Sequence, residues 1–341
     1  MIKIVLDCLG GDGGTAATAG GALLALDRDP DLSLVLVGDE PEIKSVLSAR
    51  PGIARRTETV HAPDVITGDD KPTDAIRLKK DSSLIKSISL LRSDDSLAGL
   101  VSTGATGAIV ACATLRLGRV RGIRRPAFCP ILPNMKGGIV GICDSGANME
   151  VTPEMLLQYA VMGSMYLGSV FGIKSPRAAL LNVGTEEEKG DDLHREAFAL
   201  LRSCPYVNFT GNMEGRELLS GKYDLAVCDG FSGNVMVKTV EGTALQLMKK
   251  IKKDIYSRGI YKFGALFMKR MFAEEKEFMN YQNYGGSVML GIEKTVVKGH
   301  GSGDASAVAR CIEQAYTMEK NAYAPKLAEV IEKIDAAAVT G

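Results

Sequence analysis

The chain has 341 residues, of which 45% are hydrophobic and 24% are charged. This composition is typical of a folded globular protein and excludes an intrinsically disordered one. The 41 basic side chains balance the 41 acidic ones, so the chain lacks the basic surplus that binding to nucleic acid normally requires. We therefore expect no nucleic-acid partner.

The seven cysteines are odd in number and include no Cys-x-x-Cys pair, so we expect buried thiols in a reducing cytosol, with no disulfide and no metal site. The apolar stretch that starts at Ile2 ends at Asp7, which is too short for a signal peptide. Two longer uncharged segments, 96–115 and 155–173, are interrupted by hydroxyl, amide and glycine residues. We expect both in the protein core and not across a membrane.

Short runs of Val, Ile and Leu alternate with segments of helix length, which is typical of a mainly parallel sheet with helices on both faces. The predicted strands are 2–6, 32–37, 57–61, 98–102, 126–132, 138–143, 178–183, 206–210, 224–228 and 295–299. The predicted helices are 15–28, 40–49, 73–92, 105–117, 153–171, 191–202, 232–256 and 304–320. The expected fold class is α/β, with three layers and a mainly parallel sheet.

One break interrupts the alternation, because strands 126–132 and 138–143 follow each other directly. The connection 133–138 predicts a hairpin, and we expect a lobe boundary there. No internal repeat or Pro/Ser-rich linker divides the chain, so residues 1–341 are expected to form a single intertwined unit.

Ligands of open α/β sheets bind beyond the carboxyl ends of the strands, where several loops of this chain contain glycine. The first loop contains Gly11-x-Gly13-x-x-Ala16, a partial dinucleotide fingerprint, and Asp39 ends the second strand where a ribose-binding acid would lie. Against this interpretation, Asp12 places a carboxylate where pyrophosphate would bind. An NAD-dependent dehydrogenase is therefore one alternative function.

The loop 298–304, Lys-Gly-His-Gly-Ser-Gly-Asp, is the strongest phosphate cradle in the sequence, since it combines a cation, an imidazole and a hydroxyl with three glycines before a helix. The loop 101–108 places small and hydroxyl side chains at another helix N-terminus. Together these loops predict a phosphate-containing ligand held largely by backbone amides. A non-catalytic protein that binds phosphate or an acyl group is a second alternative.

Eight stretches carry a family pattern: DCLGGD (7–12), VSTGATGA (101–108), DSGAN (144–148), LLNVGTEEEKG (180–190), NFTGNMEGRE (208–217), CDGFSGNVMVKTVEG (228–242), NYGG (283–286) and KGHGSGD (298–304). With these stretches in this order, the chain resembles the acyl-acyl-carrier-protein:phosphate acyltransferases of bacterial phospholipid synthesis, the PlsX family. Leu9 stands where the family usually has Met, and Ala105 where it usually has Asn, so the contacts of the loop 101–108 would come from its backbone amides.

The resemblance implies a fold similar to that of isocitrate and isopropylmalate dehydrogenases and of phosphate acetyltransferase, usually in a homodimer. It implies that a fatty acyl carrier protein reacts with inorganic phosphate to give acyl phosphate and free carrier protein, with no cofactor. Phosphate is already a nucleophile, so positioning supplies much of the catalysis and no covalent enzyme intermediate is required.

For this reaction we expect Lys189 and His300 beside the phosphate or the developing charge. We expect Asn234 and Asn212 to donate to the substrate and Asp229 to orient one of these donors. The predicted catalytic residues are thus Lys189, Asn234, His300 and Asp229. The predicted substrate-binding residues are Asp12, Ser102, Thr103, Asn148, Asn212, Glu214 and Ser302.

The segment 245–283 predicts a basic amphipathic helix, since residues 245–272 hold eight Lys and Arg against one acid, with Leu, Ile, Phe and Met between them. It could be a solvated helix face, a docking site for acidic carrier protein or a contact with an anionic membrane surface. The resemblance favours the last, and implies a cytoplasmic protein attached peripherally to the inner face of the cell membrane. The predicted membrane contacts are Lys262, Phe263, Leu266, Phe267, Lys269 and Arg270.

Overall fold

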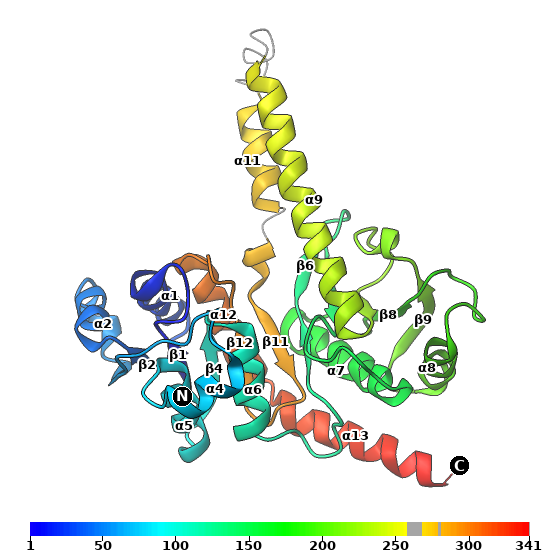
Figure 1. The fold of residues 1–341 in the computed structure, drawn as a ribbon, viewed down its shortest axis with the longest axis horizontal. Helices are drawn as coiled ribbons and strands as arrows, with labels where there is room; N and C mark the ends of the chain where they lie inside the picture. The colour runs from blue at the N-terminus through cyan, green and yellow to red at the C-terminus, as the bar shows by residue number, and fades with distance from the viewer. Residues whose placement is uncertain (258–267, 279–280, 341) are drawn as a thin grey trace.

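The computed structural model describes residues 1–257, 268–278 and 281–340 (Figure 1). Seven strands form one sheet in the order β3-β2-β1-β4-β12-β11-β5, and five form another in the order β6-β7-β10-β8-β9. The strands are β1 (Ile2–Asp7), β2 (Leu32–Gly38), β3 (Thr57–His61), β4 (Leu97–Ser102), β5 (Ala127–Cys129), β6 (Ile131–Pro133), β7 (Ile139–Cys143), β8 (Arg177–Leu181), β9 (Asn208–Met213), β10 (Leu225–Val227), β11 (Ser287–Leu290) and β12 (Thr295–Lys298).

Helices separate most of these strands along the chain. The α-helices are α1 (Gly14–Arg28), α2 (Glu40–Leu47), α3 (Pro51–Ala54), α4 (Pro72–Leu78), α5 (Ser83–Ser93), α6 (Thr106–Arg116), α7 (Pro153–Phe171), α8 (Asp192–Ser203), α9 (Gly230–Ser257), α11 (Lys269–Phe278), α12 (Ala305–Lys320) and α13 (Tyr323–Thr340). Two short 3₁₀ helices are η1 (Gly215–Glu217) and η2 (Tyr281–Tyr284).

The predicted three-layer, mainly parallel α/β fold is confirmed. In the first sheet β1 pairs in parallel with β2 and β4, and β4 with β12, while β11 is antiparallel to its neighbours. In the second sheet β10 pairs in parallel with β7 and β8, and β6 is antiparallel. Alternate residues of β1 face opposite layers: Ile4 and Leu6 pack in the cluster that contains α1 and α12, and Val5 in the cluster that contains α5.

Several features of the fold differ from the predicted elements, among them the short helix α3, which was not predicted. The expected strand 126–132 is two strands, since the chain leaves the seven-stranded sheet after Cys129 and enters the other sheet at Ile131, with Pro130 between them. The expected helix 73–92 is also two, because Ser82 has extended backbone and precedes a new helix. The short strand β11 and the helix α13 were not predicted.

The hairpin over 133–138 is present, since β6 and β7 pair in an antiparallel manner on either side of it. Both strands belong to the five-stranded sheet, and the chain changes sheet just before β6. One large apolar cluster contains residues of both sheets, including Leu34 of β2 and Leu180 of β8. The division into lobes at 133–138 stays a prediction.

The two uncharged segments of the sequence lie inside the molecule. The first forms β4 and α6, and the second is α7, whose Tyr159 and Tyr166 are fully buried. The helix α7 packs against β7 and β10 of one sheet and against β11 of the other. Among the described residues, no helix combines the length and the apolar content that crossing a membrane demands.

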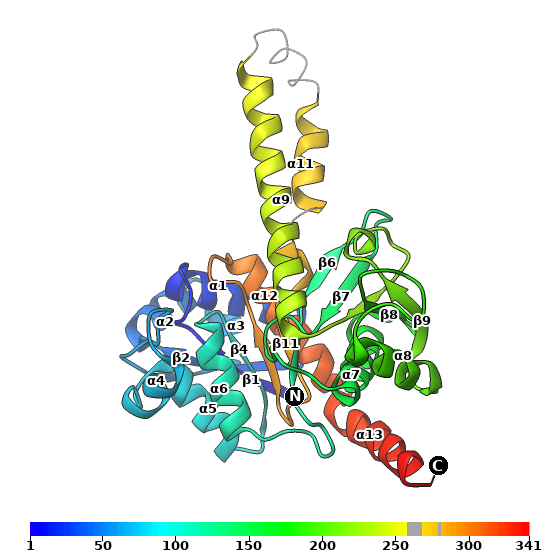
Figure 2. The same cartoon turned by 45° about the vertical axis from the view of Figure 1, so that its right-hand side comes forward.

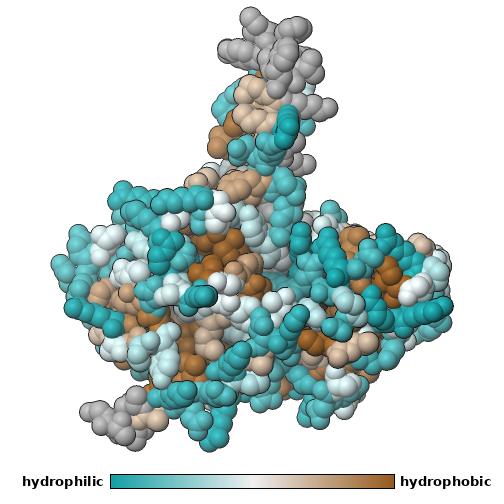
Figure 3. Space-filling model, turned by 180° about the vertical axis from the view of Figure 1, so that it is seen from behind, coloured by the Kyte–Doolittle hydropathy of each residue, from teal (hydrophilic) through white to brown (hydrophobic). Residues whose placement is uncertain are grey.

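A narrow projection leaves the body of the molecule (Figure 2). It consists of the outer part of α9 and of α11, which lie side by side in both ribbon views (Figures 1 and 2). The first turns of α9 lie in the body, where Gly230, Gly233 and Val237 are buried. On the opposite face from Figure 1, apolar side chains gather over the middle of the body below the projection (Figure 3).

Candidate active site

The carboxyl ends of β1, β4 and β12 bring three glycine-containing loops into contact. The Asp12 amide donates to the Gly301 carbonyl over 2.8 Å, and the Gly299 amide donates to the Ser102 carbonyl over 2.9 Å. The loops approach closely because they lack side chains: a Cβ on Gly10 would fall 2.5 Å from the Cα of Gly104. This arrangement brings glycine-rich loops together where parallel strands end, which is where ligands of α/β sheets bind.

The two predicted hydroxyl residues of this region differ in their surroundings. The Ser102 hydroxyl donates to Asp7 over 2.7 Å and accepts from the Gly104 amide over 3.1 Å, so it fixes the loop. Burial raises the pKa of Asp7. The Thr103 Oγ1 is buried and has no hydrogen-bond partner in the part of the chain that the structure describes. The Thr103 hydroxyl therefore has an unused donor, whereas the Ser102 hydroxyl is fully engaged within the protein.

His300 and Ser302 form a local pair in the loop after β12. The Ser302 amide donates to Nδ1 of His300 over 3.2 Å, and the two side chains are 2.8 Å apart. With Nδ1 as the acceptor, the proton of the neutral ring lies on Nε2. Burial lowers the pKa of His300, and the charge of Lys298 lowers it further. At neutral pH the ring is an uncharged donor.

The carboxyl ends of the five-stranded sheet carry a second group of polar residues, centred on Asp144. This fully buried carboxylate accepts from the amides of Phe128 over 2.9 Å, Ser145 over 2.6 Å and Asn148 over 2.7 Å. Burial raises its pKa, although the amide donors act in the opposite direction. The Asn148 side chain donates to Asp144 and to the Pro126 carbonyl, so it also holds the loop.

The helix α9 begins against this loop. A Cβ on Gly233 would fall 1.9 Å from the Asp144 carbonyl oxygen, so glycine is required for the approach. The Asp229 side chain accepts from the Ser232 amide over 2.8 Å and thereby stabilises the first turn. Asn234 is exposed beside it, and its Nδ2 donates to the Ser145 carbonyl over 3.3 Å. Asp229 thus acts on the helix that carries Asn234.

Lys189 and Asn212 lie at the outer strands of the same sheet. The Asn182 side chain donates to the Lys189 carbonyl over 3.0 Å, which leaves the Lys189 side chain exposed. The Asn212 Nδ2 donates to the Glu186 carbonyl over 2.7 Å, which uses one of its two N–H donors. Glu214 forms an ion pair with Arg216.

The helix α9 connects the two groups of residues. Lys238, one turn after Asn234, and Glu241 both act electrostatically on His300 of the other sheet. Asn234 and His300 therefore flank the same helix, whereas no hydrogen bond or ion pair within the described ranges joins Lys189 to either of them. Asp12 is exposed and also acts on His300.

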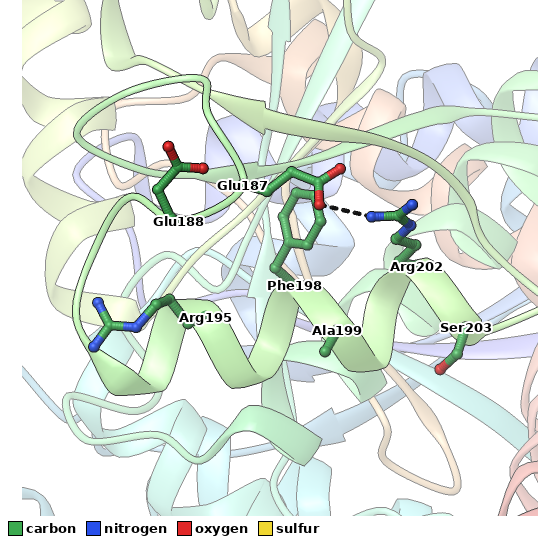
Figure 4. A pocket seen from close by; sticks show the side chains of 7 residues that line it. All are labelled: Glu187, Glu188, Arg195, Phe198, Ala199, Arg202 and Ser203. Atoms are coloured by element: carbon green, nitrogen blue, oxygen red, sulfur yellow. Dashed lines mark hydrogen bonds and ion pairs between the residues drawn. The ribbon is translucent and has the colours of Figure 1, made fainter.

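A pocket of about 640 Å³ lies beside this region, between α8 and the loop that precedes it (Figure 4). Glu187 and Arg202 form an ion pair over 2.7 Å there, and Phe198 lies between them and the helix axis. The pocket contains none of the residues predicted from the sequence. In the ranges 1–257, 268–278 and 281–340, no three His, Cys, Asp or Glu side chains are grouped so that they could hold a metal ion.

Most of the predicted membrane contacts, Lys262, Phe263, Leu266 and Phe267, lie outside the described residues. Lys269 is the first residue of α11. Arg270 is exposed on the projection and pairs with Glu274 over 2.7 Å.

Lys298 was the cation of the phosphate cradle expected from the sequence, but it was not among the predicted catalytic or substrate-binding residues. It ends β12, and its ammonium group contacts the Thr103 carbonyl over 3.4 Å. Its position in the glycine-rich loop 298–304 is the sequence feature from which it could have been predicted. Two other residues also organise the site: Asp7, the last residue of β1, and Asp144, which follows β7. Each begins a stretch of the family pattern, but neither was predicted as a site residue.

The fold belongs to the class found in phosphotransacylases. A phosphotransacetylase from Streptococcus pyogenes superposes with a TM-score of 0.60 at 16% identity, covering 94% of both chains. A branched-chain phosphotransacylase from Enterococcus faecalis V583 gives a TM-score of 0.59 at 12% identity, covering 94% of this chain and 99% of the other. At these identities the likeness defines the fold alone.

The sequence comparisons define the family. The sequence profile of the family described as "Fatty acid synthesis protein" matches residues 2–326. A protein named phosphate acyltransferase from Halalkalibacterium halodurans is 43% identical over 93% of both chains, and one from Brevibacillus brevis is 41% identical over 92% of both. The chain therefore belongs to the PlsX family of phosphate acyltransferases, as the resemblance of its motifs predicted.

Proposed function

We propose that this chain is an enzyme that transfers a fatty acyl group from the thioester of acyl carrier protein to inorganic phosphate, and so supplies acyl phosphate for phospholipid synthesis. Family membership supports the reaction class. The observation on which the site rests is that α9, which carries Asn234, begins against the loop 144–148 of one sheet, while Lys238 and Glu241 of the same helix act electrostatically on His300 of the other sheet. Such a site can bind an anion and also donate to a thioester carbonyl.

The reaction needs no other reactant. An oxygen of HPO₄²⁻ attacks the thioester carbon, the carbon–sulfur bond breaks, and the phosphate proton passes to the departing sulfur. The products are acyl phosphate and the carrier-protein thiol. The negative charge that develops on the carbonyl oxygen requires preorganised donors, each of which typically contributes about 10²–10³ in rate.

The positions of the side chains support the following roles. Asn234 is exposed at the start of α9 and donates to the carbonyl oxygen, while the neutral His300 donates through Nε2 from the opposite sheet. The Lys189 side chain is exposed, so its charge can approach the developing charge when the substrate binds. Asp229 stabilises the turn on which Asn234 stands.

Thiol release in the presence of acyl carrier protein thioester and phosphate tests this proposal. Asn234→Ala should lower turnover by about 10²–10³, as expected for loss of one oxyanion donor, and Lys189→Ala should also lower it strongly. Lys174→Ala and Asn208→Ala are matched controls, since both residues lie at the opposite ends of β8 and β9. Near-normal turnover in both site variants would remove these residues from the mechanism.

The same assay separates the alternative functions. Release of thiol that depends on phosphate supports the acyltransferase. A protein that binds thioester but releases no thiol with any acyl chain length would be a non-catalytic binder. The dehydrogenase alternative is not favoured, because the Asp39 carboxylate accepts from the Glu42 amide over 3.0 Å and caps α2.

We also propose that the segment 245–283 attaches the protein peripherally to an anionic membrane. The projection supports this because Leu245, Leu247 and Tyr256 are exposed on α9 together with Lys249, Lys250, Lys252 and Lys253. An exposed basic and apolar helix of this kind binds to anionic lipid headgroups. We expect a cytoplasmic protein on the inner face of the membrane.

Liposome sedimentation tests the attachment. The wild-type protein should sediment with anionic vesicles and remain in solution with zwitterionic ones. The double variant Phe263→Glu/Phe267→Glu should lose sedimentation, and equal binding by both proteins would contradict the proposal.

We propose, finally, that the chain forms a homodimer. The apolar side chains that gather over the body below the projection support a further protein contact (Figure 3). Light scattering after size-exclusion chromatography should give twice the mass of the chain, and a monomer at micromolar concentration would contradict this.

A further inference from the structure

The ammonium group of Lys298 is held where three loops of the seven-stranded sheet meet. Lys298 pairs with Ser102 across β12 and β4, so both residues stand at the ends of their strands. The Nζ donates to the Thr103 carbonyl over 3.4 Å and to the Gly299 carbonyl. The side chain thus bends back over the loop after β4 and is half-buried there.

This cation has no ion-pair partner among the described residues, since both of its acceptors are neutral carbonyl oxygens. Asp12 and Asp7 act on it electrostatically, beyond ion-pair distance. Asp12 is exposed, and burial raises the pKa of Asp7, which is bonded to Ser102. A half-buried charge without a counterion is costly, so the position favours binding of an anion.

Two further donors point to an anion at the same place. The Thr103 side chain is 4% exposed, and its Oγ1 lacks a partner within the described ranges. Next to it, α6 starts at Thr106 after Ala105, with no side chain that caps its first turn. A buried hydroxyl without an acceptor and an uncapped helix N-terminus are both satisfied when an anion binds over the loop.

Charges of both signs surround Lys298. Burial lowers the pKa of Lys298 to about 8, and the charge of Lys238 on α9 acts in the same direction. Cys311, Asp12 and Asp7 act in the opposite direction. A bound dianion would favour the charged form of the ammonium group and so raise this pKa.

We propose that Lys298 is the cation that binds the phosphate nucleophile, in the cradle formed by Thr103 and the first turn of α6. This inference rests on the proposed acyl transfer and adds the place of one substrate. It puts phosphate over the seven-stranded sheet. Asn234 and Lys189 stand on the five-stranded side, so the acyl thioester would approach from there.

Steady-state kinetics of Lys298→Met test the inference. The KM for phosphate should rise by about 10- to 100-fold, the effect of removing one charged hydrogen-bond partner, while the KM for acyl carrier protein thioester should stay within about twofold of wild type. Lys294→Met is the matched control: Lys294 lies just before the other end of β12 and donates to the Leu97 carbonyl over 2.8 Å. It should leave both constants unchanged, and thermal unfolding checks that both variants fold.

The pH dependence of phosphate binding by Lys298→Arg tests the inference separately, since it would not change if Lys298 had only a structural role. In the wild type, kcat/KM for phosphate should fall above a pH of about 8 as the ammonium group loses its proton. The guanidinium of arginine stays charged throughout this range, so the variant should keep its phosphate binding at higher pH. A fall at the same pH in both proteins would assign the titration to His300, Lys238, Asp12, Asp7 or Cys311 and would overturn the inference.

The result can be told apart from failure of the acyltransferase itself. If the wild type releases thiol with phosphate but Lys298→Met keeps its phosphate KM, Lys298 does not bind phosphate and the proposed function stands. If the wild type releases no thiol, the proposed function is contradicted. In that case, broadening of the ³¹P signal of inorganic phosphate tests phosphate binding by Lys298 independently of turnover. Broadening by wild type and not by Lys298→Met supports the inference, and equal broadening overturns it.

Discussion

At the scale of single residues, one carboxylate organises each end of the five-stranded sheet: the buried Asp144 at one end and the half-buried Asp224 at the other. At the carboxyl end, Asp144 gathers the amides of the loop against which α9 begins. At the other end, Asp224 accepts from the Nε of Arg177 over 2.9 Å and from its NH2 over 2.8 Å, which joins the starts of β8 and β10. The two acids do the same structural work, but only Asp144 lies beside the proposed site.

Asp224→Asn should lower the free energy of unfolding by about 1–2 kcal/mol at pH 7, because the pair loses its charge and Arg177 is partly exposed. Burial by itself would raise the pKa of Asp224, but the hydrogen bonds from Arg177 outweigh it and hold this pKa below its usual value. A lowered pKa in the folded state stabilises the fold above the unfolded-state pKa of about 3.9, and this contribution is lost as the pH falls through the folded-state pKa.

Urea unfolding of wild type and variant at pH 7 and near pH 3 measures this effect. The difference between the two proteins should shrink at the lower pH, and an equal difference at both pH values would contradict the ionic explanation. Turnover per folded molecule should not change, since Asp224 lies at the end of the sheet opposite to the proposed site.

At the scale of elements, α9 is the helix on which the proposed function depends most. It starts in contact with the loop 144–148, presents Asn234 one turn later, and continues into the projection (Figure 2). Gly230 and Gly233 allow its approach, since a Cβ on Gly230 would fall 2.5 Å from the Asn148 carbonyl oxygen. The same rigid element therefore links the site to the proposed membrane contact.

Gly233→Ala should destabilise the protein by about 1–3 kcal/mol, the usual cost of overpacking, because its Cβ would collide with the Asp144 carbonyl. The displaced helix should also move Asn234, so turnover should fall more than the loss of folded protein explains. Gly52→Ala in α3 is the control, since no atom lies within 4 Å of the added Cβ. Thermal unfolding and thiol release measure both variants, and wild-type turnover in Gly233→Ala would show that the contact is not needed.

At the scale of the whole molecule, the two sheets share one apolar core. Residues of β2, α7, α12 and β8 belong to the same buried cluster. The helix α13 covers α7 from outside, with Leu327 fully buried and the Tyr323 hydroxyl donating to the Met162 carbonyl over 3.0 Å. Loss of packing at α13 should therefore affect both sheets.

Leu327→Ala should lower the free energy of unfolding by about 2–5 kcal/mol, as expected for a cavity in a packed core. Hydrogen exchange followed by mass spectrometry should show the same loss of protection in β2 and in β8, because the shared cluster makes unfolding cooperative. A loss confined to β8 and α7 would show that the two sheets unfold separately.

Local patterns predicted most of the elements because their hydrophobic periods are strong. The strands 2–6, 32–37 and 57–61 and the helix 153–171 agree with the structure to within a residue or two. The short strand β11 gives no such signal, since only four residues pair there. The expected strand 126–132 was wrong as one element, because a continuous apolar run does not show that its halves pair with different sheets.

For the candidate site, the sequence predicted that glycine-rich loops lie at strand ends. This was possible because glycine and hydroxyl residues that directly follow an apolar run can be recognised in the sequence itself. It determined the fold class and the family in the same way. Only the tertiary structure decided which polar groups remain available. Ser102 and Asn148 are hydrogen-bonded to neighbouring loops, whereas the Thr103 hydroxyl has no partner among the described residues and Lys298 donates to carbonyl oxygens without a counterion. Hydrogen-bond partners and counterions come from segments far apart in the chain, and no local pattern encodes them.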